Sequence, residues 1–119
     1  MSTNCHIGLM HEDNTIDAIY CHWDGYPSYV GRILYKYYNN PEDITKLLSL
    51  GDISTLREDV KDTYNYDDDK GPTNYKTINK FIHACRLDYT YLYMKGKWFY
   101  RRRGDSLMML TEESIKLDQ

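Results

Sequence analysis

The sequence predicts a single α+β domain: an antiparallel sheet formed by an N-terminal and a C-terminal hairpin, with two or three helices packed on one face. Strand-like runs stand near both ends of the chain, and segments with helical periodicity lie between them. No internal repeat or linker divides residues 1–119, and a chain of this length can build one core without disulfides.

The first predicted hairpin consists of two apolar, alternating runs, residues 5–10 and 16–23, joined by polar residues 11–15. If Met10 pairs with Ile16, Cys5 and Cys21 oppose each other on one face of the sheet. The side chains that then share the other face are His6, Tyr20 and His22. A slip of one residue would instead pair cysteine with histidine.

A strand-to-helix turn follows in residues 20–27, YCHWDGYP. Gly25 permits a positive φ there, and Pro27 suits the first position of a helix. Apolar side chains then recur at helical spacing at Val30, Ile33, Leu34 and Tyr37. Gly31 costs this helix about 1 kcal/mol relative to alanine, which indicates close packing or the close approach of a ligand.

A second helix begins after Asn40, a good N-cap residue, with Pro41 in its first position and two acids in its first turn. Its inward positions are Ile44, Leu47 and Leu48, and Gly51 suits its C-cap. Residues 52–58 are expected to add a short turn, and residues 61–73 to form an exposed loop.

A third helix is predicted over residues 74–87, with one side formed by Tyr75, Ile78, Ile82 and Cys85 or Arg86. Residues 89–94 and 97–102 predict a second hairpin around Lys95 and Gly96. The tail, residues 106–119, suits a short strand or a closing helix. The two hairpins are expected to be neighbours, so that the YCHWDGYP segment and the arginines at 101–103 share an edge or a face.

Composition and charge exclude several classes of function. A net charge of −3 does not fit a general nucleic-acid binder, and no apolar run is long enough to span a bilayer. The first residues lack the pattern of a secretory signal, and three cysteines form no disulfide framework, so a reduced, cytosolic protein is expected. Thirteen tyrosines in 119 residues are about three times ordinary usage and favour recognition over catalysis.

Two reactive groupings were weighed as chemistry. The first is a zinc site formed by Cys5, His6, Cys21 and His22, although neighbours along a strand point to opposite faces. The second is a thiol nucleophile, Cys21 or Cys5, with His22 or His83 and Asp24. A buried structural cysteine explains the same residues, so no catalytic residue, metal or cofactor is predicted.

A binding site is the favoured interpretation, because aromatic rings beside arginines suit the capture of a base and its phosphates. Asp24 would orient donors in the turn, and glycines near the helix start would admit an anion. The predicted ligand-binding residues are Trp23, Asp24, Tyr26, Arg32, Trp98, Arg101 and Arg103. The same side chains would also suit a protein partner, or a purely structural role with Asp24 as a turn former.

Residues 18–34, AIYCHWDGYPSYVGRIL, resemble a family of small proteins of tailed bacteriophages and prophages. The resemblance extends to Ile7-Gly8-Leu9, to residues 48–54 (LSLGDIS) and to the tyrosine-rich residues 89–100, but not to residues 61–70. No enzymatic motif or ligand is assigned to that family, so the resemblance carries over no site residue. It implies a phage context, in which small proteins often act on host defences.

These observations predict a phage-encoded binding protein in the host cell cytoplasm that antagonises antiviral defence by sequestering a nucleotide immune signal without cleaving it. One alternative is an inhibitor of a host defence enzyme that uses acidic residues 59–69 to mimic nucleic acid. Another is a small hydrolase or nuclease built on Cys21, His22 and Asp24. The expected partner is a small nucleotide or a host defence protein, with no membrane and no sequence-specific nucleic acid; self-association stays open.

Overall fold

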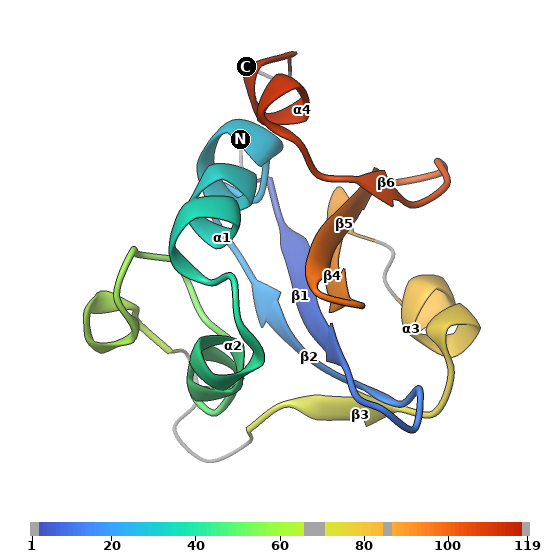
Figure 1. Cartoon of the computed structure of the whole chain (residues 1–119). Helices are drawn as coiled ribbons and strands as arrows, with labels where there is room; N and C mark the ends of the chain where they lie inside the picture. The colour runs from blue at the N-terminus through green and yellow to red at the C-terminus, as the bar shows by residue number, and fades with distance from the viewer. Residues whose placement is uncertain (1–2, 66–70, 85–86, 118–119) are drawn as a thin grey trace.

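The computed structural model describes residues 3–65, 71–84 and 87–117, which contain a six-stranded sheet in the order β3-β2-β1-β4-β5-β6 (Figure 1). The strands are β1 (Cys5–Met10), β2 (Ile16–Cys21), β3 (Thr73–Tyr75), β4 (Tyr89–Met94), β5 (Lys97–Arg102) and β6 (Met108–Met109). The helical elements are η1 (Pro27–Gly31), α1 (Arg32–Tyr37), α2 (Pro41–Leu48), η2 (Val60–Asp62), α3 (Ile78–Ala84) and α4 (Glu112–Leu117). The predicted α+β class is confirmed.

The first hairpin has the first of the two registers that the sequence left open. Met10 pairs with Ile16 and Cys5 pairs with Cys21, so both cysteines lie on one buried face. The turn closes with a hydrogen bond from the His11 amide to the Thr15 carbonyl at 2.8 Å. Asn14 occupies the left-handed region at φ 70°, which asparagine tolerates better than most residues.

The second hairpin joins β4 to β5 through Lys95 and Gly96, as predicted, with Met94 paired to Lys97. Both turn residues have positive φ, 53° and 77°, as a two-residue hairpin of type I′ requires. This hairpin lies beside the first one because β1 pairs with β4, and that pair is the parallel one in an otherwise antiparallel sheet. The predicted adjacency of the two hairpins is therefore confirmed.

One face of the sheet carries the larger core. Helices α1 and α2 lie against this face, and they bury Ile33, Leu34, Ile44 and Leu47 against Ile7, Ile19 and Tyr91 of the strands (Figure 1). Helix α2 has the predicted cap, in which the Asn40 side chain accepts a hydrogen bond from the Asp43 amide at 2.9 Å. Two of the expected helices therefore pack together on one face.

The third helix packs on the opposite face, where Phe81 of α3 is fully buried against Ile16, Ala18 and Leu92. Gly8 admits this ring, since a Cβ there would lie 3.0 Å from the Phe81 Cζ atom. The predicted helix over residues 74–87 is wrong at its start, because Tyr75 belongs to β3 and pairs with Ile16. Cys85 and Arg86 lie outside the described residues.

The first helical segment also differs from prediction at its end. Tyr37 is 47% exposed, whereas Tyr38 is 2% exposed. Helix α1 ends at Tyr37, and Tyr38 leaves helical geometry at φ −128° and ψ 65°, which turns its ring into the core. Burial raises the pKa of Tyr38 to about 12.

In the YCHWDGYP turn, the residue with a positive φ is not the one predicted. Asp24 takes the positive φ, 59°, and Gly25 is not among the residues with positive φ. Gly25 is needed instead for space, because a Cβ would lie 2.8 Å from the carbonyl carbon of Asn4. Gly31 is buried among Pro27, Tyr91 and Leu110, but a Cβ there would lie at ordinary contact distances of 3.4 Å and beyond, so packing does not require a glycine at this position.

Residues 52–58, predicted as a short turn, also pair with the end of β2, and the predicted exposed loop that follows is exposed at Lys61, Asp62 and Tyr64. The Ile53 amide donates to the Tyr20 carbonyl, and the His22 amide donates to the Ile53 carbonyl. Ile53 and Leu56 are fully buried, and Thr63 is 7% exposed. The tail contains both predicted alternatives, the short strand β6 and the helix α4.

Candidate functional site

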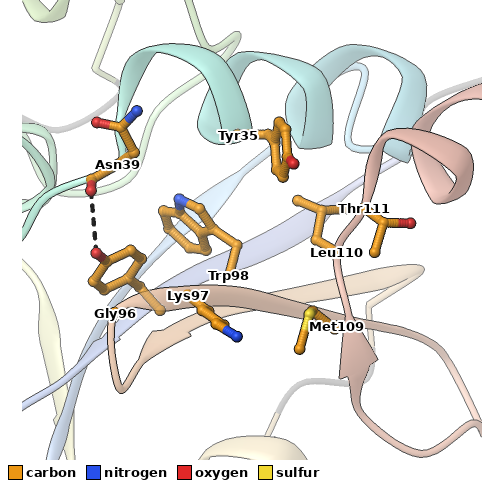
Figure 2. A pocket seen from close by; sticks show the side chains of 9 residues that line it. Tyr35, Asn39, Gly96, Lys97, Trp98, Met109, Leu110 and Thr111 are labelled. Carbon is orange, nitrogen blue, oxygen red and sulfur yellow. Dashed lines mark hydrogen bonds between the residues drawn. The ribbon is translucent and has the colours of Figure 1, made fainter.

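A cavity of about 430 Å³ opens between the end of α1, the β4–β5 hairpin and the segment that joins β6 to α4 (Figure 2). This volume falls within the range of roughly 300 to 1,000 Å³ that small-molecule sites occupy. The residues that line it are Tyr35, Asn39, Tyr93, Gly96, Lys97, Trp98, Met109, Leu110 and Thr111. We call this feature the aromatic cavity.

Trp98 forms an inner wall of the aromatic cavity. It lies opposite Tyr93 across the hairpin, and the two rings meet edge to face at 5.3 Å. Its indole Nε1 donates a hydrogen bond of 2.7 Å to the Tyr38 carbonyl. That carbonyl follows the end of α1 and has no donor within the helix, so the indole satisfies it and fixes the ring.

Tyr93 binds the same helix end in the same way. Its hydroxyl donates a hydrogen bond of 3.1 Å to the Asn39 carbonyl, the dashed line in Figure 2. Two aromatic residues of the hairpin therefore tether the chain where it leaves α1. The inner walls of the cavity are preorganised, because both rings are buried and both polar groups are paired.

The mouth of the aromatic cavity has exposed groups of a different kind. Tyr35 is 37% exposed and offers an accessible ring above Trp98 and Leu110 (Figure 2). Lys97 pairs with Met94, which packs in the smaller core beneath α3, so its side chain points away from Trp98 on the opposite face of β5. Tyr35 therefore supplies the accessible aromatic surface of the cavity.

Of the seven residues predicted from sequence, Trp98 alone lines this cavity. Trp23 and Asp24 lie at the opposite end of the sheet, beyond Cys21, which pairs with the first residue of β1. Trp23 is 44% exposed, and its ring meets the His22 ring at 4.5 Å. The Tyr26 hydroxyl donates to the Asp24 carboxylate at 3.5 Å, close to the turn.

Arg32 begins α1 and is half-buried. Arg101 donates from Nε to the Asp105 carbonyl at 2.7 Å, and Arg103 lies 3.8 Å from the Asp88 carboxylate. Asp88 itself donates its amide to the Asn4 side chain, and Gly25 donates its amide to Thr3. Arg101, Arg103 and the YCHWDGYP turn therefore lie toward one end of the sheet, on strands β5 and β2 that β1 and β4 separate, and Trp98 lies toward the other end.

A smaller cavity of about 210 Å³ lies along β5, lined by Tyr89, Tyr100, Arg102, Asp105 and Met108. The Arg102 guanidinium carbon sits 5.8 Å from the centre of the Tyr89 ring, in cation–π geometry. The arginine run thus contributes Arg102 to an aromatic surface, whereas sequence reasoning selected Arg101 and Arg103.

Sequence reasoning also missed Tyr35, Asn39, Lys97 and Met109 as lining residues. Lys97 had a visible signal, since it lies within the basic run at residues 95–103. Tyr35 lies off the apolar stripe of its helix, and such positions are ordinarily solvated. Asn39 and Met109 gave no signal, because only the meeting of three distant segments makes them neighbours.

The residues weighed for catalysis do not converge. Cys21 is fully buried, and its Sγ lies 3.5 Å from the Trp23 carbonyl. His22, the next residue, follows the strand alternation and bonds through Nδ1 to the Tyr20 hydroxyl at 2.6 Å. Asp24 lies beyond the strand, in the turn. Cys21, His22 and Asp24 therefore do not form a triad of nucleophile, general base and orienting acid.

The residues considered as zinc ligands lie on opposite faces of the sheet. Cys5 and Cys21 lie on the face covered by α1 and α2. His6 lies on the other face against the Phe81 and Tyr20 rings, and burial lowers its pKa below the ordinary value although Asp52 acts in the opposite direction. Residues 3–65, 71–84 and 87–117 contain no group of three metal-ligating side chains.

The acidic segment is partly described. Glu58, Asp59 and Asp62 are exposed, and the Asp59 side chain accepts a hydrogen bond from the Lys61 amide at the start of η2. Tyr64, 77% exposed, lies beside them in sequence. Asp67, Asp68 and Asp69 lie outside the described residues.

Comparisons with protein-family models, with curated proteins and with solved structures found no match for this chain. Within the described part of the chain, every helix is too short or too polar to cross a bilayer.

Proposed function

We propose that this chain is a small nucleotide-binding protein that antagonises host antiviral defence by sequestering a nucleotide immune signal without cleaving it. The observation that supports this function best is the aromatic cavity, which is lined by Tyr35, Tyr93 and Trp98. The resemblance of residues 18–34 to phage proteins supports a role against host defence. The cavity supports a ligand that contains a planar base.

The lining residues suit a nucleotide because aromatic rings favour the planar face of any base, and such stacking is worth about 1–3 kcal/mol per base. Tyr35, which is 37% exposed, offers a ring that a ligand can reach, and the buried Trp98 ring forms a wall of the cavity. The proposed site therefore consists of Tyr35 and Trp98, with the arginines at 101 and 103 outside it.

Binding without cleavage is supported by the placement of the reactive side chains. Among the described residues, those that line the cavity include no cysteine, histidine or carboxylate, the groups that ordinarily serve as nucleophile or general base. Cys21, His22 and Asp24 lie at the other end of the sheet and point apart. The hydrolase alternative therefore has the weaker geometric support.

Thermal unfolding with a panel of nucleotides tests the proposal. The panel contains cyclic dinucleotides, cyclic oligonucleotides, ADP-ribose derivatives and 5′-mononucleotides, and each ligand is recovered afterwards for mass analysis. A ligand at 100 times its dissociation constant should add about 2.7 kcal/mol of stability. We expect at least one ligand to raise the melting temperature and to be recovered intact.

Two tyrosine variants localise the effect. Tyr35→Ala removes an exposed ring from the cavity mouth, and Tyr64→Ala removes an even more exposed ring elsewhere. We expect the ligand-induced shift to fall in the first variant and to persist in the second. Cleaved ligand would support a hydrolase. No shift across the panel would favour an inhibitor of a host enzyme acting through Glu58, Asp59 and Asp62, whose exposed charges lie near Tyr64.

A further inference from the structure

We propose that the aromatic cavity holds a nucleotide by its base alone: it selects ligands by the area of their planar ring and leaves the phosphate in solvent. This inference rests on the proposed function and specifies which part of the ligand the cavity recognises. It follows from the groups that face the cavity and from the hydrogen bonds that those groups already make.

The charged residue among the nine lining residues, Lys97, directs its side chain away from the rings. It pairs with Met94, which packs in the smaller core, so its ammonium group lies on the face of β5 opposite to Trp98 (Figure 2). A phosphate buried among aromatic and aliphatic groups would keep its charge without a partner, which is strongly unfavourable. The phosphate of a bound nucleotide should therefore stay in water.

The buried polar side chains of the cavity bond within the chain. The Trp98 indole N–H donates to the Tyr38 carbonyl. The Tyr93 hydroxyl donates to the Asn39 carbonyl. Within the described part of the chain, the buried side-chain atom without a partner is the Thr90 hydroxyl, which does not line this cavity.

This pairing limits how the cavity can distinguish one base from another. Strong discrimination between similar ligands needs desolvated polar groups that the wrong ligand leaves unpaired. Adenine and guanine differ in the donors and acceptors on their edges but have fused rings of similar size. They should therefore bind in the aromatic cavity with similar affinity.

Tyr35 supplies the surface that a base can reach. Its ring is 37% exposed on α1 and lies above Trp98 and Leu110 (Figure 2). The contribution of such contacts grows with the apolar area that leaves water. A purine presents a larger planar area than a pyrimidine, so purines should bind more tightly.

The cavity has room for one base with its sugar. Its volume of about 430 Å³ lies near the lower end of the range of roughly 300 to 1,000 Å³ for small-molecule sites. A cyclic oligonucleotide would therefore insert one base and keep its phosphodiester ring outside. A free nucleoside and one base of a cyclic nucleotide present the same chemistry to the cavity.

Calorimetric titration with adenosine, guanosine, cytidine and uridine, and with their 5′-monophosphates, tests the inference. We expect each nucleoside to bind within about fivefold of its monophosphate, because a phosphate held by a charged side chain would contribute about tenfold or more. Adenosine and guanosine should agree within about fivefold, and both should bind more tightly than the pyrimidine nucleosides. Cyclic di-AMP should bind within about fivefold of adenosine, because its charged ring stays in solvent.

Variants at two positions locate the contact. Tyr35→Ala should weaken the binding of adenosine by about fivefold or more, and Tyr35→Phe, which restores the ring without the hydroxyl, should recover the affinity. Lys97→Gln should leave the affinities for adenosine and AMP unchanged, because the ammonium group lies on the other face of β5.

Several results would overturn the inference while nucleotide binding stands. A monophosphate that binds more than about fivefold more tightly than its nucleoside, or loss of affinity in Lys97→Gln, would show that the phosphate is held. A larger difference between adenosine and guanosine, or failure of Tyr35→Phe to recover the affinity, would show that polar groups read the base. Equal binding of purines and pyrimidines, wild-type affinity in Tyr35→Ala, or exclusion of cyclic di-AMP would also overturn it. No binding of any nucleoside or nucleotide by the wild-type protein would overturn the proposed function itself.

Discussion

At the scale of single residues, Trp98 belongs both to the larger core and to the wall of the aromatic cavity. Its ring is 4% exposed and its N–H is bonded to the Tyr38 carbonyl, so it acts as a fixed wall. Tyr35, which is 37% exposed, offers the accessible ring at the mouth. The sequence predicted that a tryptophan stacks on a base. The proposal now gives that role mainly to Tyr35, whose ring has the larger exposed surface.

His6 provides a prediction about pH. Burial against the Phe81 and Tyr20 rings disfavours the imidazolium, so the folded pKa lies below the ordinary value of 6.5. The unfolded chain then binds the proton more tightly than the folded chain. The contribution of His6 to stability is complete above pH 6.5 and declines as the pH falls below this value.

Urea unfolding of the wild type and of His6→Gln, measured between about pH 5 and pH 7.5, checks this expectation. The difference in unfolding free energy between the two proteins should change with pH below the ordinary pKa of histidine and stay constant above it. A difference that is independent of pH throughout would show that His6 keeps its ordinary pKa in the fold.

At the scale of elements, glycines fix how the YCHWDGYP turn and the first helix meet the sheet. Gly25 lies against the backbone of Asn4, and Gly31 lies in helical geometry at φ −57° with its neighbours at ordinary contact distances of 3.4 Å and beyond. One glycine is required by space, and the other gives up helix propensity without a steric need.

Alanine at these two positions should therefore have opposite effects. Gly25→Ala forces the Asn4 backbone to move and should lower stability by about 1–3 kcal/mol or more. Gly31→Ala should raise stability by up to about 1 kcal/mol, because alanine favours helical backbone. Chemical denaturation measures both changes. Equal losses in the two variants would mean that the space around Gly31 is as restricted as that around Gly25.

At the scale of the whole molecule, one sheet separates two cores. Cys21, Ile33 and Ile44 belong to the larger core, and Phe81 with Ile16 and Leu92 forms the smaller one. Because neighbouring residues of each strand supply opposite cores, neither core can lose its packing without disturbing the same strands. The fold should unfold as one unit.

Phe81→Ala tests this coupling between the two cores. Loss of a fully buried ring should lower the unfolding free energy by about 3–5 kcal/mol. In a Trp23→Phe background, tryptophan fluorescence reports Trp98 in the larger core, and transitions followed by it and by far-ultraviolet circular dichroism should coincide with and without Phe81→Ala. Separate transitions in the variant would show that the α3 face melts independently of the larger core.

The sequence by itself determined the elements with strong local signals. Apolar runs on either side of polar residues 11–15 predicted the first hairpin, Lys95 and Gly96 predicted the turn of the second, and Asn40 with Pro41 predicted the start of α2. These features depend on neighbours in sequence, where periodicity and capping act directly. The α+β class followed from the order of those elements. The register of the first hairpin was left between two choices, and the structure decided it.

Only the tertiary structure decided which residues form the cavity and which face each helix covers. Tyr75 lies in β3 because it pairs with Ile16 of β2. Tyr38 is buried because α1 ends at Tyr37 and the backbone of Tyr38 leaves helical geometry. Lys97, Tyr35 and Leu110 come from three segments that are distant in sequence. Their meeting depends on the pairing of β5 with β6 and the packing of α1, and no local pattern encodes those long-range contacts.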